Sequence, residues 1–372
     1  MVFDKQHQKA GDNSLQIQTG PVEFNNNFGI SEERVRAIYD ERLRETLREL
    51  TLEAREIACH RNQLFANDLI PKLVKAELLD AFKDPGFQML LSVAQKSAAS
   101  TERSADYELL TELLIHRVKT GEDRSAKAGI RRAVEIVDEI SNDALLSLTV
   151  SLTVLVMTSK EISIRDALDM FDKFFGKIIY DPLPRDYHWI DHLDLLNCIR
   201  IRETSHSIKM REVISEHLEG YVSEGIRKGS HQHQRAWGII GANGLPINDF
   251  LVPHEINDGY LRIPVARKAA IQELRIPDPN HSDGFSALSD EQLEVMHNVY
   301  ELYCNVDSPS ETVLNRFMSE WDSRPNLRKL REWWDGIPSA FNVTYVGIIL
   351  AYANVQRYCP GLPWLQVSFD TG

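Results

Sequence analysis

From Ser31 to Ile70 the chain reads SEERVRAIYDERLRETLRELTLEAREIACHRNQLFANDLI. Ser31 is a suitable N-cap, and the carboxylates of Glu32 and Glu33 suit the positive end of a helix dipole. Long or apolar side chains recur at alternating steps of four and three, as in a heptad seam, at Leu43, Leu47, Leu50, Ala54, Ile57, Arg61 and Leu64. Pro71 is the first residue that would stop a helix. We therefore expect one helix from Ser31 to about Ile70, roughly 60 Å long at 1.5 Å per residue.

The seam of this predicted helix suits two arrangements. It can join copies of the chain as a self-association stalk, or it can face the interior of a helical bundle within one chain. The other faces carry ion-pair spacings, Glu32 with Arg36 and Asp40 with Arg44. Because the seam is short and includes Arg61, we favour the bundle.

Residues 8–28 differ in kind from the helix that follows them. They read QKAGDNSLQIQTGPVEFNNNF, in which turn-forming residues separate short runs with the alternation of strands. Such strands are marginal alone but can be stable when copies from several chains stack. The sequence thus predicts an association segment within residues 1–30, with a flexible polar tail as the equal alternative. The residues expected to contribute to self-association, including three from the seam, are Gly11, Asp12, Asn13, Leu15, Ile17, Val22, Phe24, Leu43, Leu47 and Leu50.

The rest of the chain is a succession of helical patterns joined by short polar connectors, which favours antiparallel packing. The most apolar stretch, from Ala144 to Thr158, is too short to cross a bilayer and predicts a buried core helix. Turn signals loosen the pattern over 228–265, where Tyr260–Val265 predicts a short strand. This is the best internal boundary.

The C-terminal pattern predicts a helix from Thr344 to Tyr358. Thr344 can cap it, and Gly347 would let another element approach closely. The arrangement resembles the closing helix of small winged-helix-like modules. We therefore expect an all-α protein that comprises a β-type association segment, a helical bundle and a smaller helical C-terminal domain of winged-helix-like character, at residues 1–30, 31–227 and 228–372.

Composition places limits on function. The chain has 372 residues, of which 43% are hydrophobic and 26% charged, and a formal net charge of -13. This composition excludes global disorder and argues against a surface that binds nucleic acid or anionic lipid as a whole. Four separated cysteines, with no CxxC pair, indicate reduced thiols, and the first residues lack a secretion-signal pattern. We expect a cytoplasmic protein without a membrane segment.

The densest group of metal-capable side chains lies between residues 186 and 194. His188 and His192 are four residues apart and share one face of a predicted helix, and Asp191 could add a carboxylate to a divalent metal. The order of a zinc protease motif is absent, and no third-ligand source is evident. A solvated face of an amphipathic helix is the favoured alternative.

A basic, tryptophan-containing stretch lies between residues 324 and 334. Its cations could meet phosphates while a tryptophan stacks on a base, as in single-strand binders. The candidate nucleic-acid residues are Arg324, Arg328, Lys329 and Arg331. Leu327, Leu330 and Trp334 nevertheless fit one helical face, which favours a core helix with charges on its wet side.

Enzyme signatures are missing. The sequence contains no dinucleotide fingerprint, no P-loop, no G-x-S-x-G elbow and no cysteine in a catalytic signature. We expect no cofactor, and we lean towards a protein that is not an enzyme.

Several short motifs resemble a known family. They are QKAGDNS at 8–14, GIS at 29–31 before the long helix, AQKSAA at 94–99 and VTYVGIILAYAN at 343–354. Together they resemble an uncharacterised bacterial family with an N-terminal QKAGDNS-type motif and a mostly helical chain. The resemblance implies no reaction or catalytic residue. Similar N-terminal motifs on proteins linked to conflict with phages imply a partner from a bacterial defence system.

The sequence therefore predicts a non-enzymatic, self-associating assembly or sensing component, with other copies of itself as the first partner and a role in anti-phage defence as a further suggestion. Two alternatives remain open. One is a metal-dependent hydrolase or nuclease that uses His188, Asp191 and His192. The other is a nucleic-acid-binding protein that acts through its C-terminal domain.

Overall fold

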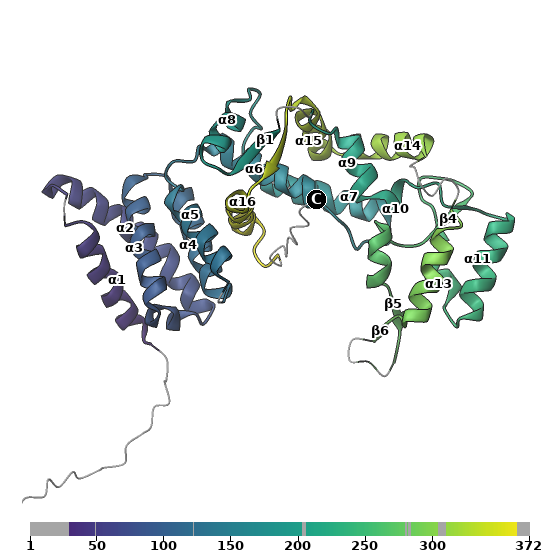
Figure 1. Cartoon of the computed structure of the whole chain (residues 1–372), viewed down its shortest axis with the longest axis horizontal. Coiled ribbons are helices and arrows are strands. Elements are labelled where there is room, and N and C mark those ends of the chain that lie inside the picture. Colours follow the sequence, from purple (N-terminus) through teal and green to yellow (C-terminus); the bar gives the residue numbers. More distant parts are fainter. Residues whose placement is uncertain are drawn as a thin grey trace, which may run out of the picture.

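The structure is a computed structural model that describes residues 30–362, except 49, 122, 203–205, 280, 282–283 and 304–309. The described part is an all-α protein with a few short strands, as predicted. Its helices form two hydrophobic cores, one of which is much larger than the other. In Figure 1 helices α1 to α5 lie at one end and α11 and α13 at the other, with α6, α7 and α16 between them.

The first part of the large body is a bundle of helices followed by a buried central helix. Its elements are α1 (Glu32–Thr46), α2 (Leu52–Lys75), η1 (Leu79–Lys83), α3 (Pro85–Ser100), α4 (Ser104–Lys119), α5 (Arg124–Glu135), α6 (Asn142–Val156), α7 (Ile164–Ile178) and α8 (His188–Leu195). Ten of the fifteen residues of α6 are buried, which confirms the core helix predicted from its apolar sequence. Ser147 and Ser151 are buried within it, and Thr149 donates to the carbonyl of Leu145.

The prediction of a single helix from Ser31 to Ile70 is wrong. The chain turns back after Thr46, and Thr51 caps a second helix by accepting from the backbone N–H of Ala54. The turn lets α2 pack against α1, where the hydroxyl of Tyr39 donates to the carbonyl of Asn62 at 2.9 Å. Pro71 lies inside α2 and does not end it. Packing against a neighbour thus outweighs the continuity of the local helical pattern.

The C-terminal segment returns to the large body. Its elements are α14 (Glu311–Asp322), α15 (Pro325–Gly336), β7 (Ala340–Val343) and α16 (Tyr345–Tyr358). Strand β7 pairs antiparallel with β1 (Ile199–Arg202), and α16 packs against α4, α5 and α6. Thr344 caps α16 as predicted. The expected close approach at Gly347 is also confirmed, because a Cβ there would lie 2.1 Å from the carbonyl oxygen of Cys198.

The second core belongs to an insertion in the middle of the chain. It follows α9 (Met210–His217) and α10 (Glu219–Val222) and ends before α14. Its elements are β2 (Ile226–Arg227), α11 (His231–Ala242), α12 (Ile247–Phe250), β3 (Val252–Pro253), β4 (Tyr260–Arg262), η2 (Lys268–Glu273), β5 (Arg275–Pro277), β6 (Phe285–Ala287) and α13 (Asp290–Tyr300). Strands β2, β4 and β3 form one small sheet and β5 and β6 another.

These cores change the expected division of the chain. The second core begins at Ile226, close to the predicted boundary, but its last member is Tyr303. Residues 313–353 contribute side chains to the large core instead of forming part of a C-terminal domain over 228–372. The pairing of β1 with β7 gives the physical reason, since it ties residues 340–343 to a strand within the predicted bundle domain over 31–227. None of the described helices is long and apolar enough to span a membrane.

A buried arginine joins the insertion to the large body. The Arg262 side chain is completely buried and donates to the carbonyl oxygens of Ile263 in the insertion and Ile162 before α7. Its guanidinium carbon lies 5.1 Å from the ring centre of Tyr221 in α10. Nearby, the backbone N–H of Gly220 donates to the carbonyl of Ala266 at 2.8 Å. The two bodies are thus joined by the Arg262 side chain and by a hydrogen bond between backbone groups.

His254 lies beside this junction, and its buried, hydrogen-bonded position indicates that acid destabilises the fold. Its Nε2 contacts the carbonyl of Ser223 at 3.0 Å, and its Nδ1 accepts from the N–H groups of Ile256 and Asn257. Burial lowers the pKa of His254 from an ordinary 6.5 to about 4, and the charge of Arg262 acts in the same direction. Because the unfolded chain binds the proton more tightly, the contribution of neutral His254 to the stability of the fold is complete above pH 6.5. It is lost as the pH falls towards 4.

We expect this histidine to cost the native state at most about 3 kcal/mol between pH 7 and pH 4, from 1.36 kcal/mol per pKa unit. Urea unfolding at both pH values would measure the loss. His254→Asn keeps an acceptor for the two N–H groups and removes the titration, so its stability should fall less across the same pH range. An equal fall in both proteins would show that His254 is not responsible.

Candidate functional site

The histidine pair predicted as a metal site lies on α8 but does not assemble one. His192 contacts the backbone beyond α5, with its Nε2 3.2 Å from the carbonyl of Glu139 and 3.3 Å from the N–H of Ser141. His188 and Asp191 are exposed. Within the part of the chain that the structure describes, no group of three His, Cys, Asp or Glu side chains is placed to hold a metal ion. The contacts of His192 therefore favour a structural role for this side chain over metal binding.

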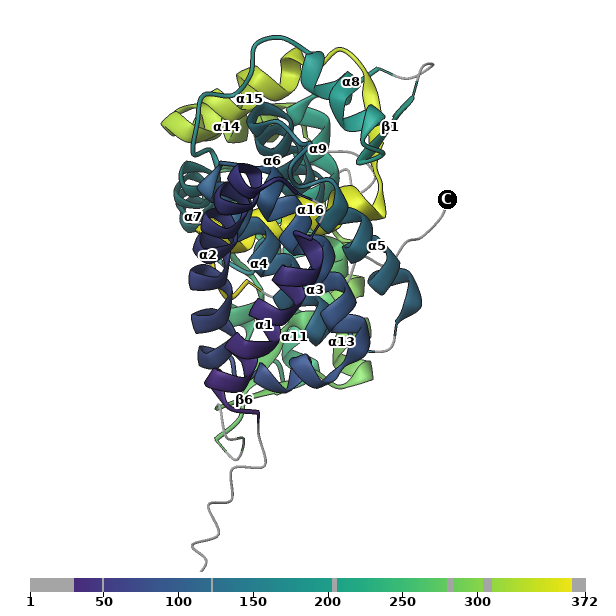
Figure 2. The ribbon, with the colours of Figure 1, turned by 90° about the vertical axis from the view of Figure 1, so that its left-hand side faces the viewer.

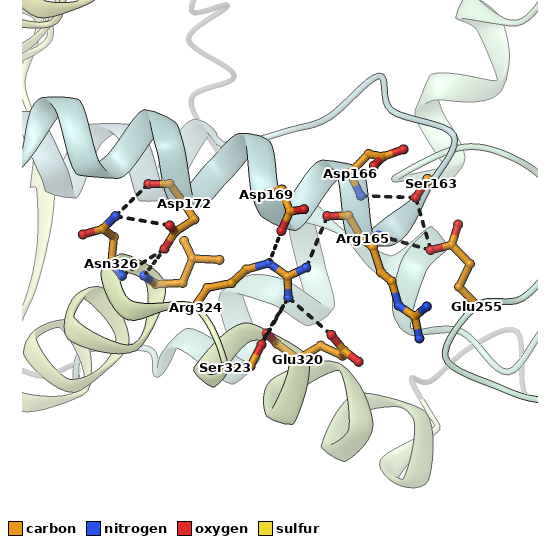
Figure 3. Close-up of polar contacts among 11 residues, drawn as sticks. Ser163, Arg165, Asp166, Asp169, Asp172, Glu255, Glu320, Ser323, Arg324 and Asn326 are labelled. Carbon is orange, nitrogen blue, oxygen red and sulfur yellow. Dashed lines mark hydrogen bonds and ion pairs between the residues drawn. The ribbon is translucent and has the colours of Figure 1, made fainter.

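Arg324, the first of the predicted nucleic-acid residues, links two helices of the large body (Figure 3). Its Nε donates to Asp169 of α7 at 2.6 Å, and its Nη1 donates to the carbonyl of Glu320 of α14 at 2.7 Å. Its Nη2 reaches the carbonyl of Arg165. Only 13% of the Arg324 side chain is exposed. The Arg324 side chain therefore links α7 to α14 through hydrogen bonds within the chain.

Asp172 of α7 makes a second link of this kind, also shown in Figure 3. Its carboxylate accepts from the backbone N–H of Asn326 at 2.9 Å and of Leu327 at 3.3 Å, in the first turn of α15. The Asn326 side chain donates back to the carbonyl of Asp172 at 3.1 Å. A carboxylate at a helix N-terminus satisfies free N–H groups and suits the helix dipole. Asp172 thus caps a helix more than 150 residues further along the chain.

The insertion caps α7 in the same way. Glu255 accepts from the Ser163 hydroxyl at 3.3 Å and from the backbone N–H of Arg165 at 3.2 Å. Figure 3 shows this carboxylate beside the first turn of α7, at the opposite end of the helix segment from Asp172. Helix α7 is therefore held by Arg324 from the turn between α14 and α15, by the link of its own Asp172 to the first turn of α15, and by Glu255 from the insertion.

The remaining predicted nucleic-acid residues lie on α15. Arg331 forms two hydrogen bonds with the carboxylate of Asp322, at 2.7 and 2.9 Å, which raise its pKa. Arg328 donates to the carbonyl of the same Asp322 at 2.7 Å. Lys329 is exposed and borders a hollow beside Trp333. The arginines of this set make contacts within the chain, which favours the structural alternative.

The predicted self-association residues fall into two groups. Those in the N-terminal segment, Gly11, Asp12, Asn13, Leu15, Ile17, Val22 and Phe24, lie outside the described residues. Of the seam, Leu43 is half-buried, Leu47 is buried in the α1–α2 hairpin, and Leu50 is 39% exposed.

The seam continues along α2 on the outside of the molecule. Ile57 is 55% exposed and Leu64 43% exposed, although both are large apolar residues. Pro71, seven residues after Leu64, is exposed on the same side of the helix. Glu53 and Lys75 extend this side towards the two ends of α2. We call Glu53, Ile57, Leu64, Pro71 and Lys75 the outer face of α2.

The outer face belongs to an edge of the molecule. Figure 2 looks onto the end formed by the N-terminal helices, where α1 and α2 lie in front of α3 and α4. The opposite side of α2 is buried by Phe65, Leu69 and Leu73. No described residue forms an ion pair with Glu53 or Lys75. The outer face is therefore available to a partner.

Sequence reasoning missed a second feature of this hairpin, a groove between α1 and α2 that is lined by four arginines. The signal was present as arginines at positions 36, 44, 48 and 55, but a single straight helix would have spread them along its length. The hairpin turn brings them to one groove.

Cys198 and Cys59 differ in their surroundings. Burial raises the pKa of the Cys198 thiol to about 12, which disfavours thiol chemistry there. Cys59 is an exposed free cysteine that borders the groove.

Comparison with known proteins gives one match. The model of an uncharacterised protein family matches residues 29–364. No curated protein and no solved structure matches the chain.

Proposed function

The chain belongs to this uncharacterised family, which offers no activity to transfer, and we propose from the surface of the protein itself that it is a self-associating assembly component whose copies meet through the outer face of α2. The supporting observation is the row of exposed residues Ile57, Leu64 and Pro71 at heptad spacing on a helix whose other side is well packed. An apolar row of this kind, flanked by charges, is typical of a contact between helices.

Charge favours a second copy in antiparallel orientation as the partner. Leu64 lies midway between Glu53 and Lys75 in sequence, so a two-fold axis at Leu64 places each Glu53 opposite the Lys75 of the other copy. The same axis places Ile57 opposite Pro71. A parallel pair would instead bring Glu53 against Glu53 and Lys75 against Lys75, which is unfavourable.

The size of the face sets the expected strength. Helix α2 has 24 residues and is about 36 Å long, so a contact about 10 Å wide buries roughly 700 Å² in total. Stable interfaces bury about 1,200 Å² or more. The α2 contact is therefore a weak, concentration-dependent one, and the predicted association segment within residues 1–30 would supply a second contact.

The charge pattern and the apolar row can be tested together by sedimentation velocity on the full chain. We expect dimers at about 100 μM protein, as a Kd in the micromolar range requires. Ile57→Glu with Leu64→Glu should leave a monomer, since it buries charges at the centre of the face. Leu195→Glu, which alters a more exposed leucine on α8, is the control. A wild-type chain that stays monomeric at this concentration contradicts the proposal, and so does a double variant that dimerises as the wild type does. A shortened chain from residue 30 should dimerise more weakly than the full chain, because it lacks the second contact.

A charge exchange tests the antiparallel orientation. Lys75→Glu should weaken the dimer about tenfold, because it replaces two attractive pairs with repulsive ones. Adding Glu53→Lys restores opposite charges and should restore the dimer. In a parallel pair neither change would alter the balance of like charges. Thermal unfolding of each variant separates loss of association from loss of folding.

A further inference from the structure

The α1–α2 groove is a hollow with a surplus of positive charge. It has a volume of about 700 Å³, within the range of small-molecule sites. Arg36, Arg44, Arg48 and Arg55 line it, and Asp40 is the single acidic residue among its described lining. This surplus of positive charge stands out in a chain whose net charge is -13.

Three of these arginines gather where the hairpin turns. Arg55 donates from Nη2 to the carbonyl oxygens of Arg48 and Leu50, both at 3.1 Å, which holds its guanidinium against the turn. Its Nε is buried without a hydrogen-bond partner. The described residues supply no carboxylate within 4.0 Å of Arg44, Arg48 or Arg55. The turn therefore presents guanidinium groups whose charge no described carboxylate neutralises.

The fourth arginine, Arg36, differs from these three because a carboxylate neutralises its charge. Arg36 donates from both Nε and Nη2 to Glu32, at 3.0 and 2.8 Å, as its spacing predicts. The corresponding pair predicted between Asp40 and Arg44 does not form an ion pair in the structure. Arg44 is left directed to the groove, with Arg48 and Arg55 beside it.

The rest of the groove suits an aromatic ring with polar edges. Leu47 and Ile70 are buried apolar lining residues, and Gln63 and Asn67 are exposed amides further along α2. Gln63 lies eight residues from Arg55, a rise of about 12 Å along the helix. A ligand of that length would carry an anionic group at one end and hydrogen-bonding edges at the other.

We propose that the α1–α2 groove binds a nucleotide, with its phosphates on Arg44, Arg48 and Arg55 and its base on the apolar lining near Gln63. Guanidinium groups bind phosphate through paired, charge-assisted hydrogen bonds. Amide side chains are suited to the edge of a base. The groove lies on a different side of α2 from the outer face, so nucleotide binding does not depend on self-association.

Calorimetric titration of the full chain with ATP, and separately with inorganic tripolyphosphate, tests this proposal. We expect ATP to bind more tightly than tripolyphosphate, and Arg44→Ala with Arg48→Ala to weaken ATP at least tenfold through the loss of charge-assisted bonds. The control is Arg34→Ala with Arg235→Ala, which removes the same charge from exposed positions outside the groove. Absence of ATP binding, equal weakening by the control, or equal affinity for ATP and tripolyphosphate would overturn the assignment.

Cys59 provides a second readout at the groove itself. It is exposed and borders the groove, whereas Cys198 is buried. We expect saturating ATP to slow modification of Cys59 by a thiol reagent at least fivefold, as followed by mass spectrometry of the peptide that contains it. Unchanged modification under conditions where ATP is bound would place the nucleotide elsewhere.

Discussion

Gly347→Ala should lower the free energy of unfolding by about 3 kcal/mol, the upper range for a group forced into a packed site. The new Cβ would lie 2.1 Å from the carbonyl oxygen of Cys198 and 2.9 Å from the Val343 side chain. That oxygen cannot move away freely, because it accepts from the backbone N–H of Thr344 at 2.9 Å. Relief would require α16 to withdraw from Cys198, just before β1, and to open the large core.

Gly238→Ala is the matched control for urea unfolding. Gly238 also lies within a helix, α11, but a Cβ there has no neighbour within 4 Å. Alanine is a better helix former than glycine, so the control should be unchanged or up to about 1 kcal/mol more stable. A Gly347→Ala protein as stable as the control would contradict the tight contact between α16 and Cys198.

Arg262→Met should be comparably damaging, with a loss of about 3 kcal/mol if two buried carbonyls are left without donors. Methionine keeps much of the side-chain volume but cannot donate to Ile162 or Ile263. Removal of a buried charge can stabilise a protein when its partner is also replaced. Here the partners are backbone groups and stay in place, so the loss of hydrogen bonds should dominate.

The measurement is urea unfolding together with hydrogen exchange of the insertion. Arg227→Met, on the neighbouring strand β2, changes an exposed arginine and should alter stability by less than about 0.5 kcal/mol. In the Arg262 variant we expect faster exchange in residues 226–266, because the contact with the large body is lost. Equal stability of the two variants would mean that the cost of burying the Arg262 charge cancels its hydrogen bonds.

The two surfaces of the α1–α2 hairpin give the protein a consistent physical description. The outer face of α2 offers an apolar contact for a second copy, and the groove offers positive charge to a small anion. Both depend on the same turn after Thr46, which the continuous helical pattern of the sequence conceals. Sedimentation and calorimetry test them separately, so failure of one proposal leaves the other standing.

Local features of the fold could be predicted from the sequence because their causes lie within a few residues. Ser31 and Thr344 cap helices through N–H groups three positions away. The apolar run of α6 and the helix from Thr344 to Tyr358 need only side-chain periodicity to be recognised. Gly347 indicated a close approach, although its partner at Cys198 could not be identified from the sequence.

The sequence by itself thus determined an all-α protein, its helix caps and the loosening of the pattern before the insertion. Only the tertiary structure decided that the long first helix is a hairpin, that the C-terminal helices return to the large core, and that Arg324 and Asp172 act as structural links. The physical reason is that a cap or an apolar period acts within a few residues. A contact such as Asp172 with Asn326 depends on which distant segments are brought together by burial of the whole core.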